Sequence, residues 1–287
     1  MLLDRNRVGL ILRVFSPKPE LVEQNVDQVI DTVNVALAIE VGGKRVFSRI
    51  DVLVSADSRH GDTDCGDTTA ALREAIGDST KRNVHVAEVR HGDIFCGMLN
   101  YGVAHQMRDR IDYTMILSSG VKSYLTSENM EAMLSALEAG AKVTGLAISE
   151  LAQSILDGRI ANTFAIWHNE SLATVGGFDL RAAKPLKDDR LVDYARGWSP
   201  ERGEVFYNVA GVEEIIPLIR LVKTFGPCIA PVLPVTGARW VVSDDPDVQK
   251  REQSKLGTKF ERQMRWFVAE NADFSFLKGG VLPEFRS

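Results

Sequence analysis

The sequence predicts an α/β fold in which a mostly parallel β-sheet is covered by helices on both faces. Apolar runs of strand length recur along the chain, separated by stretches in which apolar residues follow the helical period. Parallel strands need a crossover connection, and a helix usually supplies it. The alternation of the two patterns therefore favours a parallel sheet that is buried on both sides.

The first two elements show both patterns next to each other. Residues 8–15 (VGLILRVF) form an apolar run that ends at Ser16 and Pro17, which predicts a buried strand. Between residues 22 and 37 apolar side chains then recur at spacings of mostly three and four. This spacing predicts one apolar face of a long helix, which ends near Gly42.

The alternation continues over most of the chain. Further strands are predicted at residues 50–55, 84–89, 113–117, 142–148 and 163–167. Helices are predicted at residues 67–76, 94–107, 127–139 and 213–224. Asp67 or Thr68 is expected to cap the first of these helices and Ser127 the third, because their side-chain oxygens can accept from free amides of the first turn.

Two regions depart from this alternation. Residues 180–209 are charged and contain Pro and Gly, which predicts a long loop that can act as a lid. After Trp240 the composition becomes polar. We therefore predict a main α/β domain over residues 1–240 and a C-terminal extension over residues 241–287.

The composition excludes several classes of protein. The chain has 287 residues, of which 45% are hydrophobic, and a net charge of −5. These values exclude collagen-like and disordered chains, and the charge disfavours a non-specific nucleic-acid binder. The three widely spaced cysteines suit neither a disulfide framework nor a metal clip. Without an apolar run long enough to span a bilayer, a reduced cytoplasmic protein is expected.

Familiar nucleotide and hydrolase motifs are missing. The chain has no GxGxxG after the first strand, no GxxxxGK[ST] and no GxSxG. This disfavours a Rossmann dinucleotide site, a P-loop and an α/β-hydrolase. In an α/β sheet ligands bind at the carboxyl ends of the strands. The residues expected there are 13–16, 57–60, 118–121 and 167–170.

A series of short segments, in order, resembles the inverting family 2 glycosyltransferases of the GT-A fold. The segments are LILRVFS at the first strand, VLVSADS at the second, MLNYGVAHQ in a helix and DYTMILSSG at the fourth strand. They continue with VGGFD at residues 175–179, the acidic pair in GVEEIIPLIRL and RQMRW at residues 262–266. The resemblance spans residues 6–266, and the VGGFD segment followed by an acidic pair is its most specific part.

The resemblance implies transfer of a sugar from a nucleotide diphosphate-sugar to an acceptor hydroxyl with inversion. The resemblance does not identify the acceptor, which can be a glycan, a lipid or a small molecule. Whether the protein forms a homo-oligomer also stays open. Glu214, or its neighbour Glu213, is the implied general base. His168 and Asp179 are the implied acceptor contacts, and the C-terminal extension is expected to pack on or cover the nucleotide site. The residues implied in nucleotide or donor binding are Arg13, Phe15, Asp57, Asn100, Ser118, Ser119, Arg262, Arg265 and Trp266.

Each of these residues also has a structural interpretation. Two glutamates at a helix start can simply complement the helix dipole. Asp57 can form an Asx turn at the end of a strand, and Arg13 can pair with an internal carboxylate. The basic run before Trp266 can be a solvated helix face, with the indole anchoring the tail by packing.

The metal site of the family is missing from its usual place. The resemblance implies a DxD motif after the fourth strand, but Ser118 and Gly120 occupy those positions. Mg²⁺ and Mn²⁺ prefer carboxylate oxygens, which neither residue supplies. The protein therefore works without a metal, takes a carboxylate from elsewhere, or is a non-catalytic binding or scaffold protein. A nucleotidyltransferase is disfavoured because SPKPE is a poor match to a glycine-rich basic loop.

Three aspartates near the second strand are an alternative source of metal ligands. Asp62, Asp64 and Asp67 lie in GDTDCGD, but the segment lacks the spacing and the terminal glutamate of an EF-hand. A turn followed by a helix cap is the favoured interpretation. Asp244 lies in a polar segment and is predicted to stay in a loop.

Overall fold

The structure is a computed structural model that describes most of the chain. The residues that it describes are 7–16, 18–56, 64–77, 83–89, 94–146, 158–160, 162–182, 196–199, 204–207, 212–235, 259–273 and 275–286. Asp57, Asp62 and Asp244 lie outside these ranges, so the predictions made for them remain predictions.

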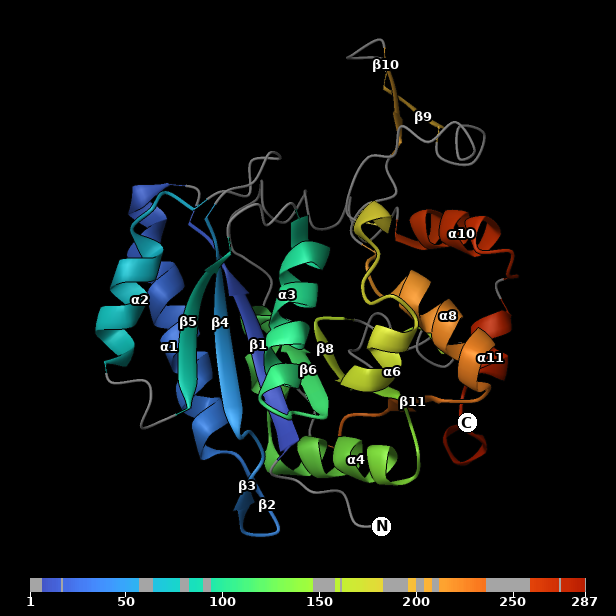
Figure 1. Ribbon diagram of the computed structural model, residues 1–287, viewed down its shortest axis with the longest axis horizontal. Coiled ribbons are helices and arrows are strands. Elements are labelled where there is room, and N and C mark those ends of the chain that lie inside the picture. Colours follow the sequence, from blue (N-terminus) through green and yellow to red (C-terminus); the bar gives the residue numbers. More distant parts are fainter. Residues whose placement is uncertain are drawn as a thin grey trace.

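A seven-stranded sheet in the order β11-β7-β8-β6-β1-β4-β5 forms the centre of the molecule (Figure 1). Six of its strands run in one direction, and only β8 is antiparallel to its two neighbours. The predicted mostly parallel α/β sheet is therefore confirmed. Its strands are β1 (Val8–Val14), β4 (Arg49–Ser55), β5 (Val84–Val89), β6 (Tyr113–Leu117), β7 (Val143–Leu146), β8 (Phe164–His168) and β11 (Ile229–Val232).

Helices cover both faces of the sheet, and each face has its own apolar core (Figure 1). Along β1, Leu10 and Leu12 belong to one core and Ile11 to the other, as the alternation of a strand requires. One core includes side chains of α1 (Val22–Ala38), α2 (Thr68–Ile76) and α4 (Ser127–Glu138). The other includes side chains of α3 (Ile94–Arg108), α6 (Asn169–Thr174), α8 (Ile215–Phe225), α10 (Lys259–Ala269) and α11 (Phe276–Gly279).

Two small strand pairs lie outside the main sheet. Strands β2 (Glu40–Val41) and β3 (Lys44–Arg45) form a hairpin after α1. Strands β9 (Arg196–Ser199) and β10 (Glu204–Tyr207) form a second pair, which projects from the body in Figure 1. The segment predicted as one long loop thus contains a strand pair, in which Gly197 of β9 pairs with Phe206 of β10.

The helix caps differ from two of the predictions. Thr126 rather than Ser127 caps α4, since its side chain accepts from the amide of Asn129 at 3.3 Å. Asp67 occupies the N-cap position of α2 but its side chain makes no capping bond. Asp64 supplies that acceptor instead, three residues upstream, because the turn brings its Oδ2 to 3.3 Å from the amide of Thr68.

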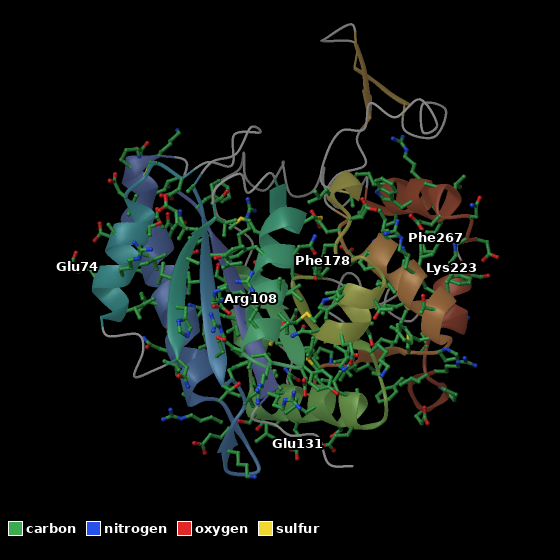
Figure 2. The ribbon with its side chains drawn as sticks, in the orientation of Figure 1. Glu74, Arg108, Glu131, Phe178, Lys223 and Phe267 are labelled. Atoms are coloured by element: carbon green, nitrogen blue, oxygen red, sulfur yellow. The ribbon has the colours of Figure 1, made fainter. Side chains whose placement is uncertain are left out.

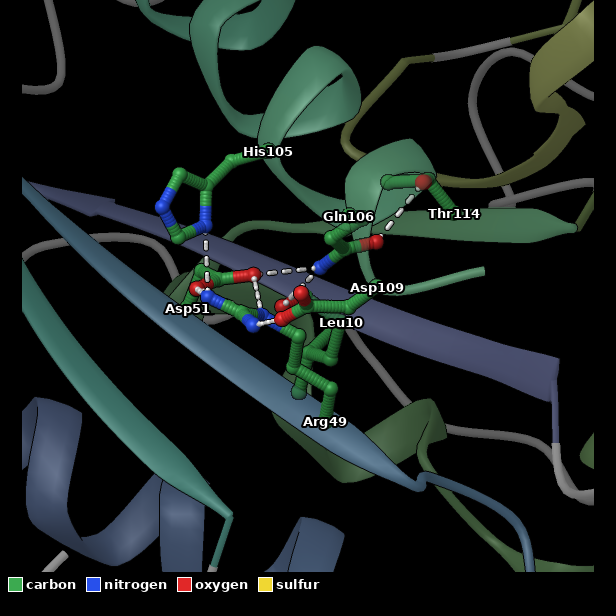
Figure 3. Close-up of polar contacts among 7 residues, drawn as sticks. All are labelled: Leu10, Arg49, Asp51, His105, Gln106, Asp109 and Thr114. Atoms are coloured by element: carbon green, nitrogen blue, oxygen red, sulfur yellow. Dashed lines mark hydrogen bonds and ion pairs between the residues drawn. The ribbon is translucent and has the colours of Figure 1, made fainter. Parts of the chain in front are cut away.

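A buried polar network attaches α3 to the sheet (Figure 3). Arg49 donates to the carboxylate of Asp51 through Nε and Nη2, at 2.8 and 2.7 Å. Gln106 of α3 donates through Nε2 to Asp51 at 2.8 Å and to the carbonyl of Leu10 at 3.1 Å. Its Oε1 accepts from the Thr114 hydroxyl at 2.7 Å. These bonds connect α3 to β1, β4 and β6, and so fix the helix that forms one wall of the candidate site.

Candidate functional site

The strand order identifies the edge of the sheet where a ligand is expected. From β1 the chain proceeds outwards to β4 and β5, and then returns to place β6 on the other side of β1. In open α/β sheets ligands bind outside the carboxyl ends of the strands at such a reversal. A cavity of about 230 Å³ lies there. Its lining residues are Ile11, Arg13, Val14, Phe15, Asn25, Gln28, Val29, Leu99, Ile116, Leu117, Ser118, Ser119 and Thr163.

Four of the predicted donor-binding residues meet in this cavity. Arg13 and Phe15 come from the end of β1, and Ser118 and Ser119 follow β6. The Arg13 guanidinium lies over the Phe15 ring, 4.9 Å from its centroid, and Nε donates to the Met98 sulfur at 3.3 Å. Arg13 is the one charged side chain among the described lining residues, so the cavity suits an anionic group.

The segment after β1 is fixed by a hydrogen-bond cluster. The amide of Ser16 donates to Asp64 Oδ1 at 2.8 Å, and the Thr68 hydroxyl donates to the Ser16 hydroxyl at 2.7 Å. Asn25 donates to the carbonyl of Phe15 at 3.1 Å. Because Asp64 accepts from backbone amides, the turn-and-cap interpretation of this aspartate is confirmed.

A second group of predicted residues lies where α8 begins. Glu214 occupies the N-cap position of α8, with only 2% of its surface exposed. Burial lowers the pKa of Arg262, a residue of α10, and the charges of Glu213 and Glu214 oppose that shift. Because α10 also packs against α8, Arg262 lies within electrostatic range of the acidic pair.

Trp266 and Arg265 follow on the same helix, α10. Trp266 is 1% exposed and belongs to the apolar core, as its structural interpretation predicted. Arg265 is half-buried. Of the predicted basic residues only Arg13 lines the cavity, so the position of the C-terminal residues relative to a donor stays a prediction.

The VGGFD segment is hydrogen-bonded to α3. Asn100 donates to the Phe178 carbonyl and accepts from the Phe178 amide, both at 2.8 Å. Both polar atoms of the Asn100 side chain are therefore hydrogen-bonded to protein backbone. Burial and the charges of Glu213, Asp179 and Glu214 raise the pKa of the Cys96 thiol, which places these carboxylates near the first turns of α3.

Asp179, the residue after Phe178, anchors the same end of the VGGFD segment to other helices. Its carboxylate pairs with Arg220 Nη2 at 3.1 Å, and Arg220 also donates to Glu270 at 2.8 and 3.2 Å. The ion pairs join the segment to α8 and to the residue that follows α10. The structure thus assigns Asp179 a role in positioning, and the predicted acceptor contact remains a prediction.

His168 lies at the opposite end of the sheet from the cavity. The expectation that β8 presents its carboxyl end to the ligand edge is wrong, because β8 is antiparallel to β6. His168 pairs with Tyr113 at the start of β6, and its Nδ1 accepts from the amide of Ser171 as the cap of α6. Since the cavity lies beyond the other end of β6, we do not include His168 in the proposed site.

The position of His168 predicts a pH dependence of stability. Burial, and then the charge of Lys142, lower its pKa below the ordinary value of 6.5. The unfolded chain therefore binds this proton more readily, and stability falls as the pH drops below about 6.5. We expect urea denaturation between pH 7.5 and 5.5 to show a smaller decline for His168→Asn, which caps but does not titrate. Equal declines would contradict this role.

Several lining residues were not predicted from the sequence. Asn25, Gln28 and Val29 come from α1, and Leu99 comes from α3. Thr163 precedes β8, and the antiparallel direction of that strand brings it to the ligand edge. A pattern of apolar residues does not give the direction of a strand, so this residue had no signal in the sequence.

The described residues do not fit a divalent metal. No group of three or more His, Cys, Asp or Glu side chains within them could hold an ion. The described part of the cavity carries a guanidinium, hydroxyls and amides, and no carboxylate. This donor set is unfavourable for Mg²⁺ or Mn²⁺ and favourable for an anion.

Comparisons with known proteins give structural neighbours only. No family model matches the chain, and no curated protein matches it. A mannosyltransferase from Pyrobaculum calidifontis, solved with GDP-Man and Mn²⁺, is 14% identical with a TM-score of 0.40, over 92% of this chain and 74% of that one.

Two further solved structures are similar to this chain. A 4-diphosphocytidyl-2C-methyl-D-erythritol synthase from Anaerococcus prevotii is 9% identical with a TM-score of 0.48, over 88% of this chain and 98% of that one. A protein from Desulfovibrio desulfuricans that is named a "putative nucleotide-diphospho-sugar transferase" is 11% identical with a TM-score of 0.46. The match covers 96% of this chain and 99% of that one. Because all three scores lie below 0.5, we base the functional proposal on the chain's own geometry.

The structure also bears on membrane attachment. None of the helices in the described ranges has the length and apolar character needed to cross a bilayer.

Proposed function

We propose that the protein binds a nucleotide diphosphate-sugar in the cavity at the carboxyl ends of β1 and β6 and transfers the sugar to an acceptor hydroxyl with inversion. The observation that carries this proposal is the cavity itself. It lies at the reversal of strand order, and its one charged described lining residue is Arg13. Its volume of about 230 Å³ is below the usual range of ligand pockets, so it would enclose only part of the donor.

Each polar group of the cavity has a part in this reaction. Arg13 and the hydroxyls of Ser118 and Ser119 would hold the diphosphate, and Arg13 would stabilise the negative charge that develops on it. Asp57, which follows the β4 strand, would contact the nucleotide. No described carboxylate lines the cavity, so we propose that the guanidinium supplies the charge that a metal supplies elsewhere.

The acidic pair supplies the base in this proposal. Glu214 would accept the proton of the acceptor hydroxyl while the hydroxyl oxygen forms a bond to the anomeric carbon. The bond between that carbon and the diphosphate oxygen breaks, and the nucleoside diphosphate leaves with the electron pair. Glu213 is the alternative base, since it is half-buried whereas Glu214 is buried.

Arg13→Ala is the variant that tests the cavity. We expect its Kd for a nucleoside diphosphate to rise about 10–100-fold, because a charge-assisted contact contributes roughly 1.5–3 kcal/mol. Calorimetric titration of the wild type and the variant measures this change. Arg7→Ala is the matched control, since Arg7 flanks the other end of β1 and pairs with Asp112 at 2.7 Å. Equal affinities of the Arg13 and Arg7 variants would contradict the assignment of the cavity.

A further inference from the structure

Asn100 is bonded to a segment that lies 78 residues away along the chain. Its Nδ2 donates to the Phe178 carbonyl and its Oδ1 accepts from the Phe178 amide, both at 2.8 Å. The carboxamide side chain of asparagine supplies both the donor and the acceptor of this pair of bonds. Phe178, labelled in Figure 2, is 1% exposed. Its ring packs edge-on against Trp167, with 5.1 Å between the ring centroids.

The glycines of the VGGFD segment allow this close approach. Gly176 and Gly177 have φ angles of +90° and +71°, which L side chains rarely adopt. A Cβ atom on Gly177 would lie 2.6 Å from Asn100 Oδ1, so a side chain there would displace the amide. The two glycines and the asparagine therefore form one structural unit.

The turn of α3 that carries Asn100 also contacts the cavity. Leu99, its neighbour, lines the cavity, and the sulfur of Met98 accepts from Arg13. The residue after Phe178, Asp179, holds the VGGFD segment to α8 through its ion pair with Arg220. The acidic pair directly precedes α8. Residues 98–100 thus contact the cavity on one side and the support of the acidic pair on the other.

We propose that Asn100 is a positioning residue that sets the placement of the acidic pair relative to the cavity. This inference rests on the proposed function and deepens it. The donor would bind in the cavity, and the base would act from the start of α8, so the reaction needs the two to be held at a fixed separation. Asn100 would then affect the transfer step far more than nucleotide binding.

The test compares Asn100→Asp with Asn169→Asp. Aspartate keeps the acceptor oxygen but loses the N–H donor. Asn100→Asp therefore leaves the Phe178 carbonyl without this donor, and Asn169→Asp does the same to the Ile111 carbonyl, to which Asn169 donates at 2.9 Å. Asn169 is the control because it also donates to a backbone carbonyl and lies at the start of α6, next to His168 at the end of the sheet opposite the cavity. Thermal unfolding establishes a temperature at which both variants are folded.

At that temperature we measure nucleoside diphosphate affinity and the kcat of sugar transfer. We expect Asn100→Asp to keep its affinity within about 3-fold and to lose about 100-fold in kcat, since small misplacements of reacting groups have effects of this size. Asn169→Asp is expected to keep both values. A kcat for Asn100→Asp no lower than that of Asn169→Asp would overturn the proposal.

Hydrogen exchange separates failure of this proposal from failure of the proposed function. A wild type that binds no nucleotide contradicts the function, and exchange without ligand then tests the positioning. We expect Asn100→Asp to increase amide exchange both at residues 213–216 and at residues 98–99. An increase confined to Phe178 and its neighbours would show a merely local bond and would overturn the positioning role.

Discussion

Glu214→Gln is expected to lower the rate of sugar transfer by about 10²–10⁴-fold, because the variant removes the proposed general base. Glutamine has nearly the same shape but does not accept the acceptor's proton. Nucleotide affinity should stay close to the wild-type value, since Glu214 is absent from the described lining of the cavity. The measurement is steady-state transfer with the donor that the protein binds, together with calorimetry.

Glu213→Gln is the companion variant, because the two glutamates are neighbours and Arg262 lies within electrostatic range of both. We expect it to lose much less activity than Glu214→Gln. The reverse order would exchange the roles of the two residues. Wild-type rates in both variants, with folding confirmed by circular dichroism, would remove the acidic pair from the mechanism.

Asp51→Ala is expected to destabilise the protein by about 3–5 kcal/mol, the usual effect of removing one partner from a buried ion pair. Asp51 is 2% exposed and Arg49 is 6% exposed. The Arg49 guanidinium would keep Asp109 as its ionic partner, but it would lose all three of its hydrogen bonds to Asp51. Gln106 would also lose one of its acceptors. Urea denaturation measures the change in the free energy of unfolding.

Two control variants test the physical reason for this loss. Asp112→Ala removes the half-exposed partner of Arg7, and a pair in contact with solvent contributes only about 0–1 kcal/mol. The double variant Arg49→Met with Asp51→Leu removes both buried charges and is expected to recover at least half of the stability lost in Asp51→Ala. A loss below 1 kcal/mol in Asp51→Ala would show that the network of Figure 3 contributes little to the fold.

The sequence was sufficient to predict the layers of the fold and one part of the site. The apolar runs and helical spacings predicted six of the seven strands of the main sheet close to their observed bounds, because burial on both faces leaves a strong pattern. The short elements β11, α6 and α11 were not predicted. The strand ends then located Arg13, Phe15, Ser118 and Ser119, which meet in the cavity because carboxyl ends of parallel strands share one edge.

Other features depend on the direction of strands and on long-range pairing, which local patterns do not record. The direction of β8 moved His168 to the far end of the sheet and brought Thr163 to the cavity. The hydrogen bond from Asn100 to the Phe178 carbonyl joins two residues that lie 78 positions apart in the sequence. Arg49 and Asp51 did leave a signal, since charges two residues apart in an otherwise apolar strand share one face and need buried partners.

The most direct test of the central claim is a calorimetric titration of the wild type with nucleoside diphosphates and nucleotide-sugars, once in EDTA and once in Mn²⁺. We expect one nucleotide to bind in EDTA with a Kd that Mn²⁺ leaves unchanged, because Arg13 takes the part of the metal. Binding only in Mn²⁺ would contradict metal-independent recognition and direct attention to Asp62 and Asp244. No binding under either condition would contradict the transferase and favour a non-catalytic binding or scaffold protein.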